Sequence, residues 1–167
     1  MLDAKSVQTP LGAHLKLSHE QSPQTETDKL EMAGIPYASA LGSLMYLMVC
    51  SRPDLGFAVS LVSRFMSNPG RTHWMALKWI MRYLQGTKSV GIVFKKNHSC
   101  DEYVEGLNDA DYAGDLDKRT STSGEMIERG EIEIEKIDGS HNPADMFTKS
   151  VPFEKHRLYM SLLQVQE

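Results

Sequence analysis

The spacing of apolar residues changes near Gly86, and this change limits the folds open to the chain. Before Gly86, apolar residues recur every three or four positions, as they do in amphipathic helices. After it, Val90, Ile92 and Phe94 alternate with other residues, as they do in a strand. The sequence therefore predicts an α+β fold, with a helical first part and a second part that mixes helices and strands.

Three helices are predicted before the change in period. The first covers residues 37–50, and Pro53 with Asp54 suits the first turn of the second, where a missing N–H and a negative charge are both tolerated. Thr72 is the expected N-cap of the third helix, which ends before Gly86. The apolar faces expected to be buried are formed by Tyr37, Leu41, Leu44, Met45 and Met48, then by Leu55, Val59, Val62 and Met66, and finally by Trp74, Leu77, Met81 and Leu84.

The second part of the chain is predicted to combine strands with short helices. Residues 131–135 alternate strictly between Glu and Ile, which is typical of a strand with one face in water. Asn142 followed by Pro143 is typical of the start of a helix. Similar patterns predict strands at residues 90–94 and 103–107, a loop between them at 96–101, a second loop at 138–141 and a last helix at 153–163.

Residues 1–36 have little periodicity and several proline or glycine breaks, so we expect an extended lead-in with one helical turn at about residues 27–32. Hydrophobic residues make up 41% of the chain and charged residues 24%, a balance found in folded globular proteins. The formal net charge of -4 argues against a protein that binds nucleic acid through its overall charge.

Cysteine usage and hydropathy bear on the cellular compartment. The two cysteines, Cys50 and Cys100, lack the spacing of a metal or redox motif, which favours a reduced, intracellular protein. The most apolar stretch, residues 41–50, is far shorter than the ~20 residues that a membrane span needs. With no targeting segment visible, we expect a cytoplasmic or nuclear protein without a membrane partner.

The region after the predicted strand at 103–107 is rich in acids. Residues 107–124 include Asp109, Asp111, Asp115 and Asp117. Two of these take positions one and three of a calcium-binding loop, but position twelve is Thr120, so the bidentate acid that closes such a loop is missing. The sequence therefore excludes an EF-hand.

Three stretches of the chain resemble a known family. Residues 36–87, PYASALGSLMYLMVCSRPDLGFAVSLVSRFMSNPGRTHWMALKWIMRYLQGT, are similar to the segment after the polymerase palm in the polyproteins of copia-type LTR retrotransposons. NDADYAGDLDKRTSTSG resembles the opening of the ribonuclease H domain that follows in those polyproteins, and HNPADMFTK resembles its end. The resemblance covers nearly the whole chain, and its motifs occur in the family's order.

This resemblance implies three parts and a metal site. Residues 1–36 would be a lead-in from the end of the polymerase region, residues 37–88 a three-helix thumb- or connection-like part, called the helical unit below, and residues 89–167 a ribonuclease H-like mixed α/β domain. It also implies that Asp109 is the first and Asp145 the last of four catalytic carboxylates that share two Mg²⁺ ions, which hydrolyse the RNA strand of an RNA–DNA hybrid.

The chain also departs from the family. No Tyr-x-Asp-Asp tetrapeptide of a polymerase palm occurs in it. In the family, a strand that completes the first sheet, a helix with a catalytic glutamate and a strand with another catalytic aspartate separate the STSG motif from the segment like EMIERGEIEIEKI. Here Gly124 is followed directly by Glu125, which indicates an internal deletion. With two of four carboxylates, we expect weak or absent Mg²⁺ binding and no polymerase or ribonuclease H activity.

Simpler interpretations of the same residues stay open. As the third residue of a helix capped by Asn142, Asp145 would favour the helix dipole regardless of catalysis. His141 is either a proton shuttle or an exposed loop histidine, and the second is favoured. The acids after Asp109 fit a solvated turn. Lys78, Arg82 and Lys88 are candidates for contacts with a nucleic acid backbone, and Trp74, Trp79 and Tyr83 for base stacking, although core packing also accounts for the aromatic residues.

Two alternatives to an inactive enzyme fragment are also consistent with the sequence. The first is a retained module without catalysis that binds nucleic acid or a protein partner, such as another segment of the polyprotein. The second is a product without function. No small-molecule substrate is indicated.

Overall fold

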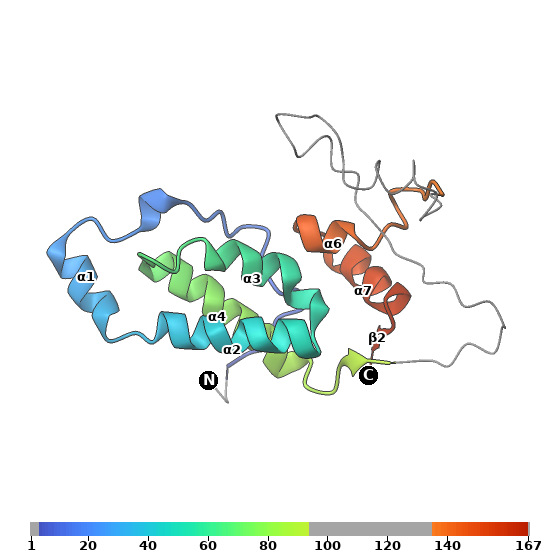
Figure 1. The fold of residues 1–167 in the computed structure, drawn as a ribbon, viewed down its shortest axis with the longest axis horizontal. Coiled ribbons are helices and arrows are strands. Elements are labelled where there is room, and N and C mark those ends of the chain that lie inside the picture. Colours follow the sequence, from blue (N-terminus) through green and yellow to red (C-terminus); the bar gives the residue numbers. More distant parts are fainter. Residues whose placement is uncertain (1–3, 94–134, 167) are drawn as a thin grey trace, which may run out of the picture.

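The computed structural model describes residues 4–93 and 135–166 of the chain (Figure 1). The α+β class stays a prediction, because the expected strand at 103–107 and residues 131–134 of the expected strand at 131–135 lie outside the described residues. The described elements are η1 (His19–Gln21), α1 (Glu26–Ala33), α2 (Tyr37–Cys50), η2 (Pro53–Leu55), α3 (Gly56–Ser63), α4 (Arg71–Gly86), β1 (Gly91–Ile92), α6 (Asp145–Thr148), α7 (Phe153–Leu162) and β2 (Val165–Gln166).

The helical unit is built by α2, α3 and α4, which lie against one another in Figure 1. The helix predicted at 37–50 is confirmed as α2, and α4 confirms the third predicted helix. Each helix turns a stripe of apolar side chains inward, as a 3.6-residue period requires. The fully buried members of the shared core include Leu41, Leu55, Val59, Val62, Leu77 and Ile80.

Two boundaries in the helical unit differ from those predicted. The expected N-cap at Thr72 is wrong: α4 begins at Arg71, and the Gly70 N–H donates to His73 Nδ1 at 2.9 Å. The prediction that α4 ends before Gly86 is also wrong, since Gly86 is its last residue.

The second helix differs more from its prediction. It is divided into η2 and α3, and α3 ends at Ser63 before a series of turns. Met66 was expected on the buried face and is exposed instead, because Phe65 takes the buried place. The Phe65 ring stacks on the His73 ring, with centroids 4.0 Å apart and planes within 7°.

The lead-in packs onto the helical unit. Val7, Leu11, Leu15 and Leu17 contact its apolar core. Its carbonyl groups also accept hydrogen bonds from α4: Trp79 Nε1 donates to Thr9, and Arg82 Nε donates to Lys5. The helix predicted at 27–32 is confirmed as the slightly longer α1, which Thr25 and Asp28 cap reciprocally.

Residues 135–166, called the C-terminal segment below, form a second and smaller core. Met146, Tyr159, Met160 and Val165 are buried in it. The helix predicted at 153–163 is confirmed as α7. The segment contacts the helical unit through α6, which packs on α3 and η2.

The strand predicted at 90–94 is confirmed only at β1, Gly91–Ile92. This strand pairs antiparallel with β2 at the end of the chain, with Gly91 opposite Gln166 and Ile92 opposite Val165. The expected partner strand at 103–107, the loop at 96–101 and Cys100 lie outside the described residues.

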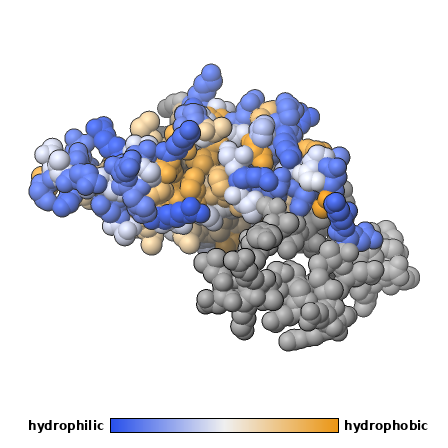
Figure 2. Space-filling model, turned by 90° about the horizontal axis from the view of Figure 1, so that it is seen from above, coloured by the Kyte–Doolittle hydropathy of each residue, from blue (hydrophilic) through white to orange (hydrophobic). Residues whose placement is uncertain are grey.

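Some apolar side chains are exposed at the surface. Figure 2 shows an apolar area between hydrophilic ends on one face of the molecule. In the described part of the chain, Tyr46 and Val49 on α2 and Leu30 on α1 are among the most exposed large hydrophobic residues. Within the same residues no single helix is long and apolar enough to cross a membrane, although α1 and α2 taken together, across a bend of 55°, reach that length and apolarity.

Candidate functional site

Asp145 is the predicted metal ligand that the structure describes, and it is the first residue of α6. The prediction that it is the third residue of a helix beginning after Asn142 is therefore wrong, because the helix begins two residues later than predicted. Asn142 still has the expected capping role: its side-chain Oδ1 accepts the Ala144 N–H at 3.1 Å, and its carbonyl accepts the Asp145 N–H at 3.3 Å. This turn fixes the direction of the Asp145 carboxylate.

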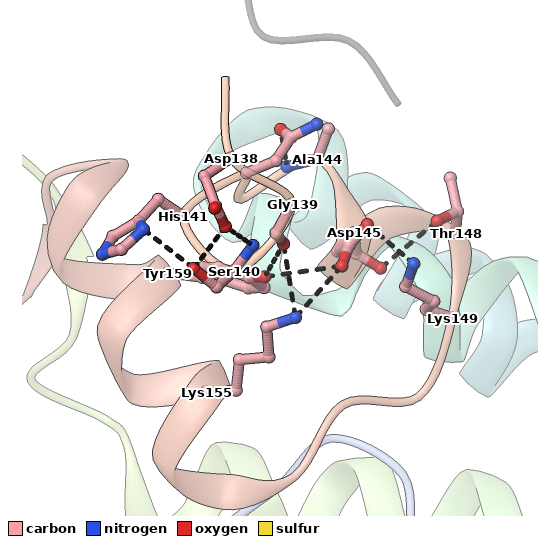
Figure 3. A network of polar contacts seen from close by, with 11 residues as sticks. Asp138, Gly139, Ser140, His141, Ala144, Asp145, Thr148, Lys149, Lys155 and Tyr159 are labelled. Atoms are coloured by element: carbon pink, nitrogen blue, oxygen red, sulfur yellow. Dashed lines mark hydrogen bonds and ion pairs between the residues drawn. The ribbon is translucent and has the colours of Figure 1, made fainter. Parts of the chain in front are cut away.

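Both carboxylate oxygens of Asp145 face ammonium groups (Figure 3). Lys149 Nζ lies 2.7 Å from Oδ1, and Lys155 Nζ lies 3.3 Å from Oδ2. The Tyr159 hydroxyl is 3.4 Å from Oδ2. The hydrogen bond from Lys149, and more weakly that from Lys155, lowers the pKa of Asp145 below its usual range. Asp145 is therefore ionised and paired with cations at neutral pH.

Side chains of α7 donate hydrogen bonds to the backbone of the loop before α6. The Gly139 carbonyl accepts from Lys155 Nζ at 3.4 Å and from the Tyr159 hydroxyl at 3.3 Å. Asp138 accepts from the Ser140 N–H and hydroxyl, and these bonds lower the pKa of Asp138. Lys155 and Tyr159 therefore hold the Gly139 loop and Asp145 together in one polar cluster, seen in Figure 3.

His141 lies in this loop and is exposed, as the simpler interpretation predicted. Its Nδ1 is 2.9 Å from the Ser140 hydroxyl. In the described structure no hydrogen bond joins it to Asp145, so this region does not show an arranged pair of acid and base.

The described residues around Asp145 do not fit a Mg²⁺ ion. Within residues 4–93 and 135–166 there is no group of three or more His, Cys, Asp or Glu side chains that could hold a metal. The carboxylate contacts two positive charges, which repel a cation, and Mg²⁺ needs several oxygen ligands in octahedral geometry. The other predicted ligand, Asp109, lies outside the described residues, as do Asp111, Asp115, Asp117 and the Gly124/Glu125 junction.

The predicted nucleic-acid contacts lie on α4 and just after it. Arg82 is already engaged, because its guanidinium lies 5.3 Å from the Trp79 ring centre and donates to the Lys5 carbonyl at 2.7 Å. Lys78 Nζ lies 5.9 Å above the Trp74 ring, and Lys88 is exposed. The structure thus leaves Lys88 exposed and Lys78 half-buried beside Trp74, and it gives Arg82 a role in holding the lead-in.

The aromatic residues considered for base stacking do not form one exposed platform. Tyr83 is buried, and its hydroxyl donates to Asp54 at 2.7 Å. Trp74 and Trp79 are half-buried, Trp74 against the core and Trp79 under the lead-in. Core packing therefore accounts for Tyr83, and the base-stacking interpretation is wrong for that residue.

Sequence reasoning missed a buried polar network in the helical unit. Arg52 donates from Nε and Nη2 to the two oxygens of Asp54, both at 2.9 Å. Arg52 also donates to the carbonyl and hydroxyl of Thr87, at 2.9 and 2.8 Å. Burial is the main reason that the pKa of Tyr83 is raised above its usual range. A signal was present in the sequence, because Arg52 and Asp54 are the first charges after a long uncharged run that begins at Met32.

Much of this sequence is shared with proteins from plant transposons. Over 127 residues the chain is 52% identical to the "Retrovirus-related Pol polyprotein from transposon TNT 1-94" of Nicotiana tabacum, an alignment that covers 76% of this chain and 9% of that protein. It is 40% identical over 130 residues to the corresponding polyprotein from transposon RE2 of Arabidopsis thaliana, covering 78% of this chain and 8% of that protein. The homologues of this chain are thus retrovirus-related Pol polyproteins from copia-type plant transposons, which supports a Pol polyprotein fragment.

This Pol-type chain spans less than a tenth of the length of those polyproteins. A third relative is much shorter than these polyproteins. The "Secreted RxLR effector protein 161" of Plasmopara viticola is 48% identical over 96 residues, which are 58% of this chain and 66% of that protein. No protein-family model matches the chain, and no solved structure matches it.

Proposed function

We propose that this chain derives from the part of a copia-type Pol polyprotein where the reverse transcriptase ends and the ribonuclease H domain follows. The similarity to retrovirus-related Pol polyproteins supports the proposal, as does the order of the three resembling stretches along the sequence. In this assignment the helical unit is the thumb- or connection-like part, and the C-terminal segment is the end of the ribonuclease H region. The protein would act in the cytoplasm or nucleus.

The ancestral reaction is hydrolysis of RNA in an RNA–DNA hybrid, and we propose that this chain does not perform it. Two Mg²⁺ ions about 4 Å apart would need carboxylates on several elements. The chain offers Asp109 and Asp145 as descendants of such ligands, and Lys149 and Lys155 pair with Asp145. The observation that carries the proposal is this pairing, because it places two positive charges at a carboxylate that would have to bind a cation.

Hybrid cleavage by the purified full chain tests this proposal. A fluorescent RNA–DNA hybrid is incubated with Mg²⁺ or Mn²⁺, with an active ribonuclease H as the positive control. We expect no turnover above the buffer background, and the same absence for Asp109→Asn and Asp145→Asn. Metal-dependent turnover that Asp109→Asn abolishes would overturn the proposed inactivity.

A second candidate function is a binding module without catalysis. It is favoured by the relative from Plasmopara viticola, in which the matching segment makes up 66% of a protein much shorter than a polyprotein. A nucleic acid or another polyprotein segment is the proposed partner. Lys88 is exposed and Lys78 is partly exposed beside Trp74, so both are available for a phosphate backbone.

Binding of an RNA–DNA hybrid at two salt concentrations tests this second candidate. Contacts with phosphates release counterions, so affinity should fall between 50 and 200 mM salt, and each lost phosphate contact should reduce the salt slope by about one. Lys78→Ala and Lys88→Ala should weaken binding, while Lys29→Ala on α1 serves as the matched control. Arg82→Ala is a less specific variant, because it also removes the bond to Lys5. Equal effects of all three lysine variants would contradict a defined binding face.

A further inference from the structure

A histidine of α7 lies where the C-terminal segment meets the helical unit. The His156 ring meets the Tyr83 ring of α4 edge-on, with centroids 5.8 Å apart and planes at 89°. On the same side, α6 packs on α3, and a Cβ added to Gly56 would lie 3.0 Å from the Phe147 ring. Docking of the segment therefore requires that His156 be enclosed between the two parts.

The enclosure disfavours the protonated, positively charged form of His156. The residue is 6% exposed, and its Nε2 has no hydrogen-bond partner within the described part of the chain. A cavity of about 20 Å³ borders the ring, enough for about one water molecule. A neutral imidazole is tolerated in such a place because Nε2 then need not carry a proton, whereas an imidazolium would have a buried Nε2–H with at most one water to receive it.

Within the described part of the chain, the charged and titratable groups around His156 come from η2, from α4 and from the residues beside η2 and α6. Tyr83 faces it from α4, Asp54 from η2, and Arg52 lies just before η2. Lys149, which follows α6, lines the same cavity. The lead-in and α3 line it with Thr9, Pro10, Leu11, Phe57 and Ala58, none of which is charged.

Asp54 is the one carboxylate in this set, and both its oxygens already accept hydrogen bonds from Arg52, with a further one from Tyr83. The positive charges of Arg52 and Lys149 would repel a protonated ring. The surroundings of His156 therefore favour the neutral ring over the charged one.

We propose that His156 is a pH-sensitive latch, which holds the C-terminal segment on the helical unit while neutral and releases it when protonated. Burial lowers the pKa of His156, Asp54 opposes this, and Arg52 adds to it. In the released state the histidine regains its ordinary pKa of about 6.5. Docking is thus at full strength above that pH, and its equilibrium constant falls by up to tenfold for each pH unit below it, until the lowered pKa of the docked state is reached.

Hydrogen exchange of the full chain at pH 7.5 and pH 5.5, corrected for the intrinsic exchange rates, tests the latch. We expect protection of α7 to fall by up to about tenfold relative to α4, and Trp79 fluorescence to change, because Trp79 shares a cleft with Val151 and Phe153. His156→Phe should abolish the pH dependence. His141→Phe is the matched control, since His141 is an exposed histidine in the same segment, and it should keep the wild-type response.

Three outcomes would overturn the latch: equal protection of α7 at both pH values, a loss of protection in α4 as large as that in α7, or an unchanged response in His156→Phe. His73 in α4 is also buried with a pKa lowered by burial, so a small loss within the helical unit is expected and should persist in His156→Phe. If His156→Phe fails to dock, an NMR titration of the wild-type ring decides the matter. Titration at the ordinary pKa while α7 stays protected is incompatible with the latch.

Discussion

Asp54 in the helical unit and Asp145 in the C-terminal segment both pair with cations, yet their surroundings differ. The Arg52 and Asp54 side chains are 5% and 0% exposed, and Tyr83 and Thr87 complete their hydrogen bonds. Lys149 and Lys155, the partners of Asp145, are 55% and 34% exposed. One pair is thus enclosed by a large apolar core, and the other lies at the edge of a small one.

The difference shows how burial decides what an ion pair does. An enclosed charge that loses its partner cannot be rehydrated, so the loss is expensive even where the intact pair adds little net stability. A carboxylate at an edge regains water when its lysines move away, and salt screens the attraction. We therefore expect the two regions to respond very differently to the removal of one charge.

The largest effect is expected from Arg52→Ala, which leaves Asp54 buried and unpaired. The free energy of unfolding should fall by about 3–5 kcal/mol, as for other broken buried pairs. Urea denaturation followed by circular dichroism measures it, with the exposed Arg64→Ala as the matched control, expected within about 0.5 kcal/mol of wild type. A loss as small as that of the control would mean that the Asp54 network is not a structural centre.

An intermediate effect is expected where the lead-in approaches α4. A Cβ added to Gly70 would lie 1.9 Å from the Gln21 carbonyl oxygen, so the backbone would have to move. Gly70→Ala should reduce the free energy of unfolding by about 1–3 kcal/mol. Gly42→Ala on α2 is the control, because a Cβ there meets no atom within 4 Å, and helix propensity predicts a gain of up to about 1 kcal/mol. The same sign for both substitutions in a denaturation assay would contradict the close approach.

The smallest effect is expected from Asp145→Asn. With partly exposed lysines and solvent screening, the stability of the C-terminal segment should fall by about 1 kcal/mol or less, as measured by hydrogen exchange of α7. The pKa of Asp145 is lowered, so its contribution is complete above the ordinary aspartate pKa of about 3.9 and is lost as the pH falls through the lowered value.

High salt should shrink the difference between Asp145→Asn and wild type, and Glu135→Gln, a substitution of an exposed acid in the same segment, should leave α7 unchanged. A loss as large as that of Arg52→Ala would remove the contrast between the two regions.

The elements predicted correctly are those that a local pattern encodes. In α2 and α4 the apolar spacing located the body of the helix, because side chains three and four positions apart share one face. The errors at Met66 and Thr72 have another origin. Phe65 is buried because its ring stacks on the His73 ring, and α4 begins where Gly70 lies close to Gln21. Both contacts join residues of different elements, so a local sequence pattern does not predict them.

The candidate site was predictable only in part. The turn at Asn142 and the place of Asp145 in the first turn of a helix could be predicted from neighbouring residues. The pairing of Asp145 with Lys155 and Tyr159 could not, because these residues come from another helix. Nor did the sequence indicate that His156 would be enclosed against Tyr83.

The sequence by itself determined the helical periods, the turns that separate them and the similarity to Pol polyproteins, since all of these depend on residues close together or on their order. The tertiary structure decided which charges are buried and which are in water. Tyr83 reaches Asp54 across 29 positions, Arg52 reaches Thr87 across 35, and Trp79 reaches Thr9 across 70. Such contacts depend on how whole helices are placed, and that placement results from the packing of the entire core.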